Sequence, residues 1–317
     1  MRASSENPYP KTFEEFLEWF PSNADCELYL EWIRWPDVLE CPRCGSHKMW
    51  RTERGLLHCG DCQHQTSVTV GTVFEGTQKP LLLWFHMMWL MMAQKTGISA
   101  KSLRETYGFG SYQTAWGWLQ KLRSVMIRCG REQLCGRVEV DETYIGGRKK
   151  GARGRGAEGK TLVLVAVEGE ASMLGRVRFR CIPTANSENI ESFVHDYVDT
   201  GAVVVTDGLP AYNGLSSIGF NHQPHSISSG GEDARQELDH VHLVVSLLKR
   251  WLMGTHQGAV RPTHLQGYLD EFAFRFNRRL SAHRGKLFHR LVEQAVVSRP
   301  KAVKDFYSTK PQHIETT

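Results

Sequence analysis

Residues 138–147 read Val-Glu-Val-Asp-Glu-Thr-Tyr-Ile-Gly-Gly and carry three acids within a segment of strand-forming residues. The β-branched and aromatic side chains favour a β-strand, and side chains alternate between the two faces of a strand. Val140 and Glu142 therefore share one face, whereas Glu139 and Asp141 share the other. Two acids on one face of a core strand are unfavourable unless their charge is neutralised, and a divalent cation would do so. A surface strand with solvated acids is the alternative.

The length and charge of the chain limit its class. A chain of 317 residues suits two or three domains, one of them with a sizeable core. The net charge of +5 is modest, but cations cluster at 148–160, 249–250 and 275–290, either as phosphate-binding patches or as solvated faces. The most apolar run, 81–92, is too short to span a bilayer, and the first residues do not resemble a signal peptide. We expect a cytoplasmic protein without a membrane partner.

Four of the eight cysteines form two C-x-x-C pairs, Cys41 with Cys44 and Cys59 with Cys62. This spacing is typical of a zinc ribbon, in which four thiolates bind one structural Zn²⁺. A module this small needs the metal to fold. Its basic residues suit either DNA contact or packing against neighbouring segments. The other cysteines are scattered, which indicates reduced thiols rather than a disulfide framework.

The segments around the ribbon have helical spacing. Short helices are predicted at 12–20 and 25–33, and a buried helix at 81–93. Residues 98–108 and 112–123 predict two helices joined by a glycine-containing turn, which is the arrangement of a helix-turn-helix. A plain helical hairpin is the alternative. The candidate DNA contacts on the second helix are Tyr112, Gln113, Thr114, Lys121 and Arg123.

Residues 146–160 contain six cations, six glycines and one acid. Such a segment cannot build a core, so we expect a flexible loop whose Arg148, Lys149 and Lys150 bind DNA phosphates, unless it is only a solvated hairpin tip. Strands are predicted at 161–167 and 175–182, a helix at 187–197, and a short buried strand at 202–206 that ends in Asp207. Three strands, a helix, a strand and a helix follow the order of the ribonuclease-H-like fold, an α/β fold with a mixed sheet and flanking helices. If the first and fourth strands are neighbours, Asp141 and Asp207 meet at one edge of the sheet.

Together these motifs resemble the transposases of bacterial insertion sequences that carry a zinc ribbon, a helix-turn-helix and a ribonuclease-H-like catalytic domain. The matching segments are CPRCGS, CGDC, VEVDETYIGG, VVTDGLPAY, SLLKRWLMGTH and YLDEFAFRFNRR, in the expected order over roughly residues 12 to 290. We therefore expect N-terminal helices at 1–35, the zinc ribbon at 36–75, the helix-turn-helix region at 76–135, the catalytic domain at 136–295 and a loose polar tail at 296–317.

The sequence departs from the family at the third acidic position, where these transposases usually carry a glutamate some seven residues before a helical lysine. Counting back from Lys249 reaches His242, and histidine is an accepted variant there. The resemblance thus implies catalytic residues Asp141, Asp207, His242 and Lys249, with Lys249 and Arg250 also close to DNA. Seven residues are nearly two helical turns, so His242 and Lys249 share one helix face. Other candidates for the third position are Glu237, Asp239, Glu271 and His240.

The resemblance implies a DNA transposase that binds terminal inverted repeats of double-stranded DNA and catalyses strand cleavage and strand transfer. It implies Mg²⁺ or Mn²⁺ at the acids, with more tolerance for Mn²⁺ because imidazole suits softer ions. Joining two element ends implies a homo-oligomer, at least a dimer. A domesticated DNA-binding regulator with a weakened catalytic domain is the alternative, and a nuclease without strand transfer is a third possibility.

Overall fold

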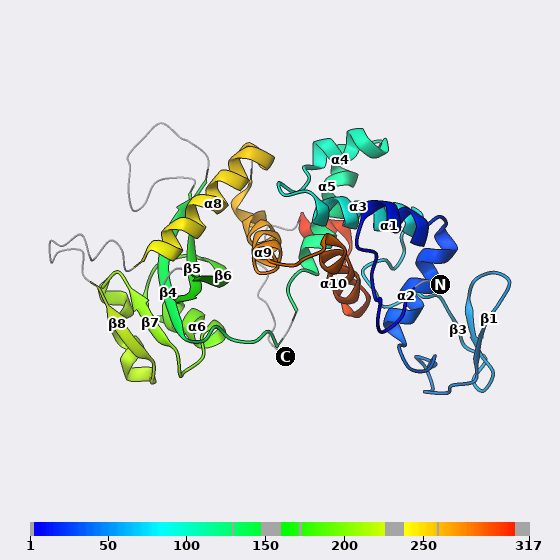
Figure 1. Ribbon diagram of the computed structural model, residues 1–317, viewed down its shortest axis with the longest axis horizontal. Helices are drawn as coiled ribbons and strands as arrows, with labels where there is room; N and C mark the ends of the chain where they lie inside the picture. Colours follow the sequence, from blue (N-terminus) through cyan, green and yellow to red (C-terminus); the bar gives the residue numbers. More distant parts are fainter. Residues whose placement is uncertain are drawn as a thin grey trace. The chain divides into compact units, whose positions relative to one another are not determined.

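The computed structural model describes residues 3–128, 130–146, 160–170, 173–225, 238–258 and 260–307. The chain divides into two compact units (Figure 1). Unit 1 contains Met1–Ile127 and Leu280–Ser308, and unit 2 contains Arg128–Arg279. Within the described part of the chain, every helix is too short or too polar to cross a bilayer.

Unit 2 is built on a mixed five-stranded sheet. Its strands are β4 (Arg137–Ile145), β5 (Thr161–Glu170), β6 (Met173–Ile182), β7 (Val203–Thr206) and β8 (Asn221–Pro224). They lie in the order β6-β5-β4-β7-β8. The first three strands in the chain pair antiparallel, and β7 then pairs parallel to β4 and β8 parallel to β7. This is the strand order of the ribonuclease-H-like fold, so the predicted fold class is confirmed. The prediction from the sequence did not include β8 or the short helix that precedes it.

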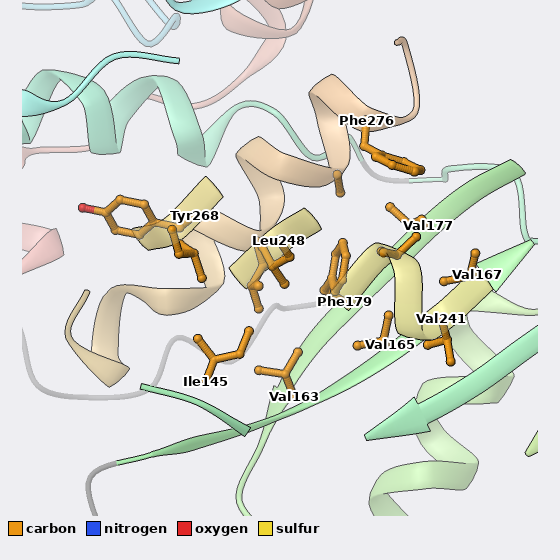
Figure 2. Close-up of a cluster of buried hydrophobic side chains, with 14 of the residues drawn as sticks. Ile145, Val163, Val165, Val167, Val177, Phe179, Val241, Leu248, Tyr268 and Phe276 are labelled. Atoms are coloured by element: carbon orange, nitrogen blue, oxygen red, sulfur yellow. The ribbon is translucent and has the colours of Figure 1, made fainter. Parts of the chain in front are cut away.

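Helices cover both faces of this sheet. On one face, α8 (Asp239–His256) and α9 (Leu265–Phe276) pack against the odd-numbered valines of β5 and against β6. Figure 2 shows Val241 and Leu248 of α8 over Val165 and Phe179. On the other face lie α6 (Ser187–Tyr197) and η1 (Pro210–Ile218). Because both faces of β5 are covered, its residues 162–167 are all apolar and do not alternate with polar ones.

The side chains of β4 alternate as the sequence predicts. Val138 and Val140 belong to the core beneath α6, and Ile145 belongs to the core beneath α8. Glu139 and Asp141 therefore lie on the α8 side of the strand. This alternation brings Glu139 and Asp141 to the first turn of α8.

Unit 1 is mainly helical and includes the small three-stranded sheet of the ribbon. Its elements are α1 (Phe13–Trp19), α2 (Asn23–Arg34), β1 (Met49–Arg51), β2 (Leu57–Cys59), β3 (Gln65–Thr66), α3 (Leu81–Ala93), α4 (Ala100–Tyr107), α5 (Tyr112–Ser124), α10 (Arg284–Val297) and η4 (Val303–Phe306). The predicted helix starts are confirmed where a hydroxyl caps the first turn, as Thr12 does for α1 and Ser111 for α5. The α4–α5 pair has the predicted helix-turn-helix order, with Gly108 in the left-handed conformation at the turn.

The end of the chain differs from the predicted domain limits. The expected catalytic domain extends to residue 295, but α10 packs on α3 and α2 in unit 1, where Phe288 lies 5.4 Å from Phe16 and 5.5 Å from Phe85 between ring centroids. The expected loose tail includes η4, which packs on α5. A Cβ on Gly117 of α5 would lie 2.5 Å from Val303, so the glycine permits this close approach. Residues 308–317 lie outside the described part.

Candidate active site

Two parallel strands bring three carboxylates to one edge of the sheet in unit 2. Glu139 of β4 pairs with Val205 of β7. Asp141 follows two residues later on β4, and Asp207 follows directly after β7 ends at Thr206. The side chains of Asp141, Glu142 and Asp207 place oxygen atoms within 4.8 Å of one another. We call these three residues the acidic cluster. The predicted meeting of Asp141 and Asp207 is confirmed.

Each member of the acidic cluster is oriented by a hydrogen-bond donor. The backbone N–H of Glu142 donates to Oδ1 of Asp141 at 2.8 Å, and the N–H of Leu209 donates to Oδ1 of Asp207 at 3.0 Å. The hydroxyl of Tyr212, a fully buried residue of η1, donates to Oε2 of Glu142 at 2.9 Å. The carboxylates are thus held in place by the strand, by the turn after β7 and by η1.

The electrostatics of the cluster favour a bound cation. Burial raises the pKa of Asp141 to about 6, and the charges of Glu142 and Asp207 add to the rise, while His242 opposes it. Its side chain is 18% exposed. Three carboxylates this close disfavour one another's ionised forms unless positive charge is added. Their oxygen atoms are the ligands that Mg²⁺ and Mn²⁺ prefer, so the cluster fits a divalent ion.

Helix α8 adds two of the predicted residues to this edge. His242 lies in its first turn, with Nε2 3.6 Å from Oδ2 of Asp141 and a side chain that is 56% exposed. Lys249 lies about two turns further on. Partial burial and the nearby Lys160 lower the pKa of Lys249, whereas the negative charge of Asp141 opposes this. Lys249 also borders a cavity of about 170 Å³ beside Tyr144.

The other described candidates for the third position do not join the acidic cluster. Glu271 of α9 is completely buried, with its Oε1 3.5 Å from Nη1 of Arg275. His240 faces a buried glutamate of β4 instead. Asp239 starts α8 but is not part of the cluster. Glu237 lies outside the described residues. Among the described candidates, His242 is the one whose ring lies beside Asp141.

Sequence reasoning missed Glu142. Strand alternation assigns it to the face of Val140, opposite to Asp141, and this argued against a shared site. Glu142 still pairs with Leu164 of β5, but the pairing of β4 with β7 ends at Glu139, and past that point the carboxylate of Glu142 reaches the other two acids. The only available signal was its position next to Asp141.

The second cluster of possible metal ligands lies in the ribbon of unit 1. Sγ atoms of Cys41 and Cys62 are 3.6 Å apart, and those of Cys44 and Cys59 are 3.7 Å apart. All four thiols lie within 4.8 Å of one another. A tetrahedral Zn²⁺ with Zn–S distances of about 2.3 Å separates its sulfur atoms by about 3.8 Å. The four cysteines therefore fit one zinc ion.

The ribbon is attached to α2 by an ion-pair network. Arg51 of β1 lies 3.0 Å from Glu27 and also pairs with Glu31, both on α2. Of the two predicted roles for the basic residues of the ribbon, packing against neighbours thus applies to Arg51. Lys48 pairs with Asp61 within the ribbon at 3.1 Å.

The proposed DNA contacts of the helix-turn-helix differ in exposure. Tyr112, Gln113 and Thr114 are exposed in the first turn of α5, and Lys121 is half-buried. Arg123 is 1% exposed, so the prediction that it contacts DNA is wrong. Its position on α5 faces the interior of unit 1.

The remaining predicted DNA contacts are two residues of α8 and three residues that follow β4 in the sequence. Lys249 and Arg250 are both exposed on α8. Arg148, Lys149 and Lys150 lie outside the described residues.

Comparisons with known proteins match both parts of the chain. The ISXO2-like transposase domain family matches residues 133–277, and the transposase zinc-ribbon domain family matches residues 21–65. An uncharacterized protein in the transposable element ISH50 of Halobacterium salinarum is 28% identical over 284 residues, which cover 82% of this chain and 92% of that protein.

Two solved structures of Mos1 transposase complexes are more distant. A pre-cleavage transpososome has 13% identity and a TM-score of 0.30, and covers 73% of this chain and 80% of that one. The strand transfer complex has 15% identity and a TM-score of 0.29, and covers 67% of this chain and 76% of that one. The fold assignment rests on the strand order of the sheet and not on these similarities.

Proposed function

Because the chain belongs to the insertion-sequence DNA transposases that carry an N-terminal zinc ribbon, we propose that the acidic cluster is the site at which it cuts and joins DNA strands. The observation that supports this most is the meeting of Asp141, Glu142 and Asp207 within 4.8 Å, just past the last residues at which β4 pairs with β7. His242 lies beside them, 3.6 Å from Asp141. Asp141 and Asp207 come from separate segments of the chain, which suits a site that the fold assembles.

The chemistry is phosphoryl transfer between oxygen atoms. Water attacks the phosphorus atom at the end of the element, the bond to the leaving 3′ oxygen breaks, and a free 3′-hydroxyl results. That hydroxyl then attacks a phosphorus atom of the target DNA, and the target's own 3′ oxygen leaves. Divalent ions bound here would activate the attacking oxygen and stabilise the leaving oxygen.

The residues of the site have separate tasks in this proposal. Asp141 and Asp207 bind the divalent ions, and Glu142 and His242 complete the ligand set. Tyr212 orients Glu142 through its 2.9 Å hydrogen bond. Lys249 is exposed on the same face of α8 as His242 and binds a DNA phosphate near the reacting one. Magnesium and manganese both suit the oxygen ligands, and the imidazole favours manganese.

Unit 1 supplies the DNA-end binding in this proposal. The exposed start of α5, with Tyr112, Gln113 and Thr114, is suited to contact base edges because its side chains project from the end of a recognition-type helix. Zinc at the four cysteines keeps the ribbon folded. Two element ends must be joined in one reaction, so the active form is an oligomer of at least two chains acting on double-stranded DNA.

The test compares end cleavage with end binding. We expect Asp141→Asn and Asp207→Asn each to reduce cleavage of a DNA carrying the element's terminal repeats by at least about a thousandfold, because removing one ligand charge weakens the hold on the ions. Binding of the same DNA, measured by gel shift, remains within about twofold. Glu188→Gln, an exposed acid of α6, is the matched control and keeps full cleavage.

Wild-type rates in either aspartate variant would exclude the acidic cluster as the catalytic site. A wild-type protein that binds the repeats but does not cleave them with Mg²⁺ or Mn²⁺ would favour the regulator over the transposase.

A further inference from the structure

Glu139 is a buried acid that the proposed chemistry does not use. It lies on β4 two residues before Asp141 and on the same face, and it is 3% exposed. Its Oε2 accepts a hydrogen bond from the backbone N–H of Val241 at 2.9 Å. Its Oε1 lies 2.9 Å from Nδ1 of His240. A buried carboxylate is unfavourable without such partners, so both contacts with the first turn of α8 explain why it is tolerated.

The first turn of α8 has no cap of its own. Leu238 precedes the helix and provides no side-chain acceptor for the exposed N–H groups. A helix start leaves its first N–H groups without intrahelical partners, and its dipole favours a negative charge there. Glu139, 102 residues earlier in the chain, supplies both the acceptor and the charge. The start of α8 is therefore fixed to β4 by a side chain of the strand.

Strand β5 packs against the same turn of α8. A Cβ on Gly169 of β5 would lie 2.7 Å from Nδ1 of His240, so the imidazole occupies space that a larger residue would fill. The side chain of Val241 packs in the core near Val165 and Val167 (Figure 2). The contacts of Glu139, Gly169 and the valines of β5 thus surround His240 and Val241, and His242 is the next residue of the same turn.

We propose that Glu139 is a positioning residue that sets the place of His242 beside Asp141. The link is short: Glu139 and Asp141 are two residues apart on β4, and Val241 and His242 are adjacent on α8. A shift at the Glu139–Val241 hydrogen bond therefore changes the 3.6 Å separation between Nε2 of His242 and Oδ2 of Asp141 directly. This inference rests on the proposed function, since it gives Glu139 a role through a metal ligand.

The test measures Mn²⁺ affinity, which does not depend on catalytic activity. Free Mn²⁺ is followed by electron paramagnetic resonance in zinc-loaded, full-length protein without DNA. We expect Glu139→Gln to weaken Mn²⁺ binding about tenfold, as for other residues that orient a metal ligand. Gly169→Ala should weaken Mn²⁺ binding by a similar factor, because the added methyl group on β5 displaces His240 while Glu139 stays intact. This second variant tests the inference even if Glu139→Gln folds poorly. Glu188→Gln is the control and binds Mn²⁺ as wild type does.

A double-mutant cycle separates positioning from general destabilisation. If Glu139 acts through His242, adding Glu139→Gln to His242→Ala changes Mn²⁺ affinity by less than about twofold. Equal losses in both backgrounds, or wild-type affinity in both single variants, would overturn the inference and leave the acidic cluster in place. Unchanged affinity in His242→Ala alone would instead remove His242 from the ligand set of the proposed function.

Discussion

At the scale of single residues, substitutions of His242 and of Glu142 separate the contribution that each makes to the ligand set. We expect His242→Ala to reduce DNA-end cleavage by roughly a hundredfold or more, because it leaves one coordination place unfilled. His242→Glu should retain measurable cleavage with Mg²⁺, since a carboxylate oxygen suits this ion better than imidazole nitrogen does. Cleavage rates with Mg²⁺ and Mn²⁺ in parallel check both expectations. Normal cleavage by His242→Ala together with an inactive Glu142→Gln would make Glu142 the third ligand.

The raised pKa of Asp141 predicts a pH-dependent stability difference. Aspartate in an unfolded chain titrates near 3.9, whereas burial and the neighbouring acids raise the pKa of Asp141 to about 6. The folded state therefore disfavours the ionised form, and this penalty grows as pH rises from about 4 to about 6. Asp141→Asn should raise the free energy of unfolding by roughly 2–3 kcal/mol at pH 7.5 but only about 1 kcal/mol at pH 4.5.

Urea unfolding of zinc-loaded protein without Mg²⁺ or Mn²⁺ measures this difference. Glu188→Gln, which replaces an exposed acid, should show no comparable change with pH. A gain for Asp141→Asn that is the same at both pH values would contradict the raised pKa.

Single residues also show where sequence reasoning succeeds and where it stops. Asp141 and Asp207 could be placed together once their two strands are taken as neighbours in the sheet, as the ribonuclease-H-like strand order requires. Glu142 could not, because alternation assigns it to the opposite face from Asp141. The pairing of β4 with β7 ends at Glu139, and past that point the carboxylate of Glu142 reaches the other two acids, which is not visible in the sequence. Arg123 was predictable in retrospect: Trp116, Leu119 and Arg123 recur at helical spacing, and all three are buried.

At the scale of elements, the zinc ribbon is the unit whose folding depends on a ligand. Cys59→Ser should lose the zinc ion and unfold the β1–β2–β3 sheet, since Cys59 lies in β2 and is fully buried. Atomic absorption of the purified protein should show about one zinc per wild-type chain and much less in this variant. DNA-end binding should fall with it.

Cys135→Ser is the control for the zinc measurement. Cys135 is exposed and lies outside the four-cysteine cluster, so its replacement should leave the zinc content unchanged. Full zinc content in Cys59→Ser would show that the ribbon cysteines are not the ligands.

Elements that pack far from their sequence neighbours were the hardest to assign. Helix α10 was not predicted from the sequence. Its apolar residues recur at helical spacing, but that spacing cannot tell which core receives them. The structure packs Phe288 among aromatic rings from the start of the chain, including Phe20 at 5.9 Å between centroids. The buried partner surface on α2 and α3 is what assigns α10 to unit 1.

At the scale of the whole molecule, the chain leaves unit 1 at Ile127, builds unit 2, and returns to unit 1 at Leu280. In the sequence, unit 2 is thus inserted between two segments that together form unit 1. The matched transposase domain, residues 133–277, lies entirely within unit 2. A boundary drawn from motifs alone could not show this return, because the motifs end before α10 begins.

The central claim is that β4, the end of β7 and the start of α8 form one divalent-ion site. Iron-mediated backbone cleavage tests it directly: Fe²⁺ replaces the catalytic ion, ascorbate and peroxide generate radicals at the bound iron, and mass spectrometry maps the cuts. We expect cuts near Asp141, Asp207 and His242, all suppressed by excess Mg²⁺ and lost in Asp207→Asn. Cuts that avoid these three segments, or that persist unchanged in Asp207→Asn, would contradict the claim.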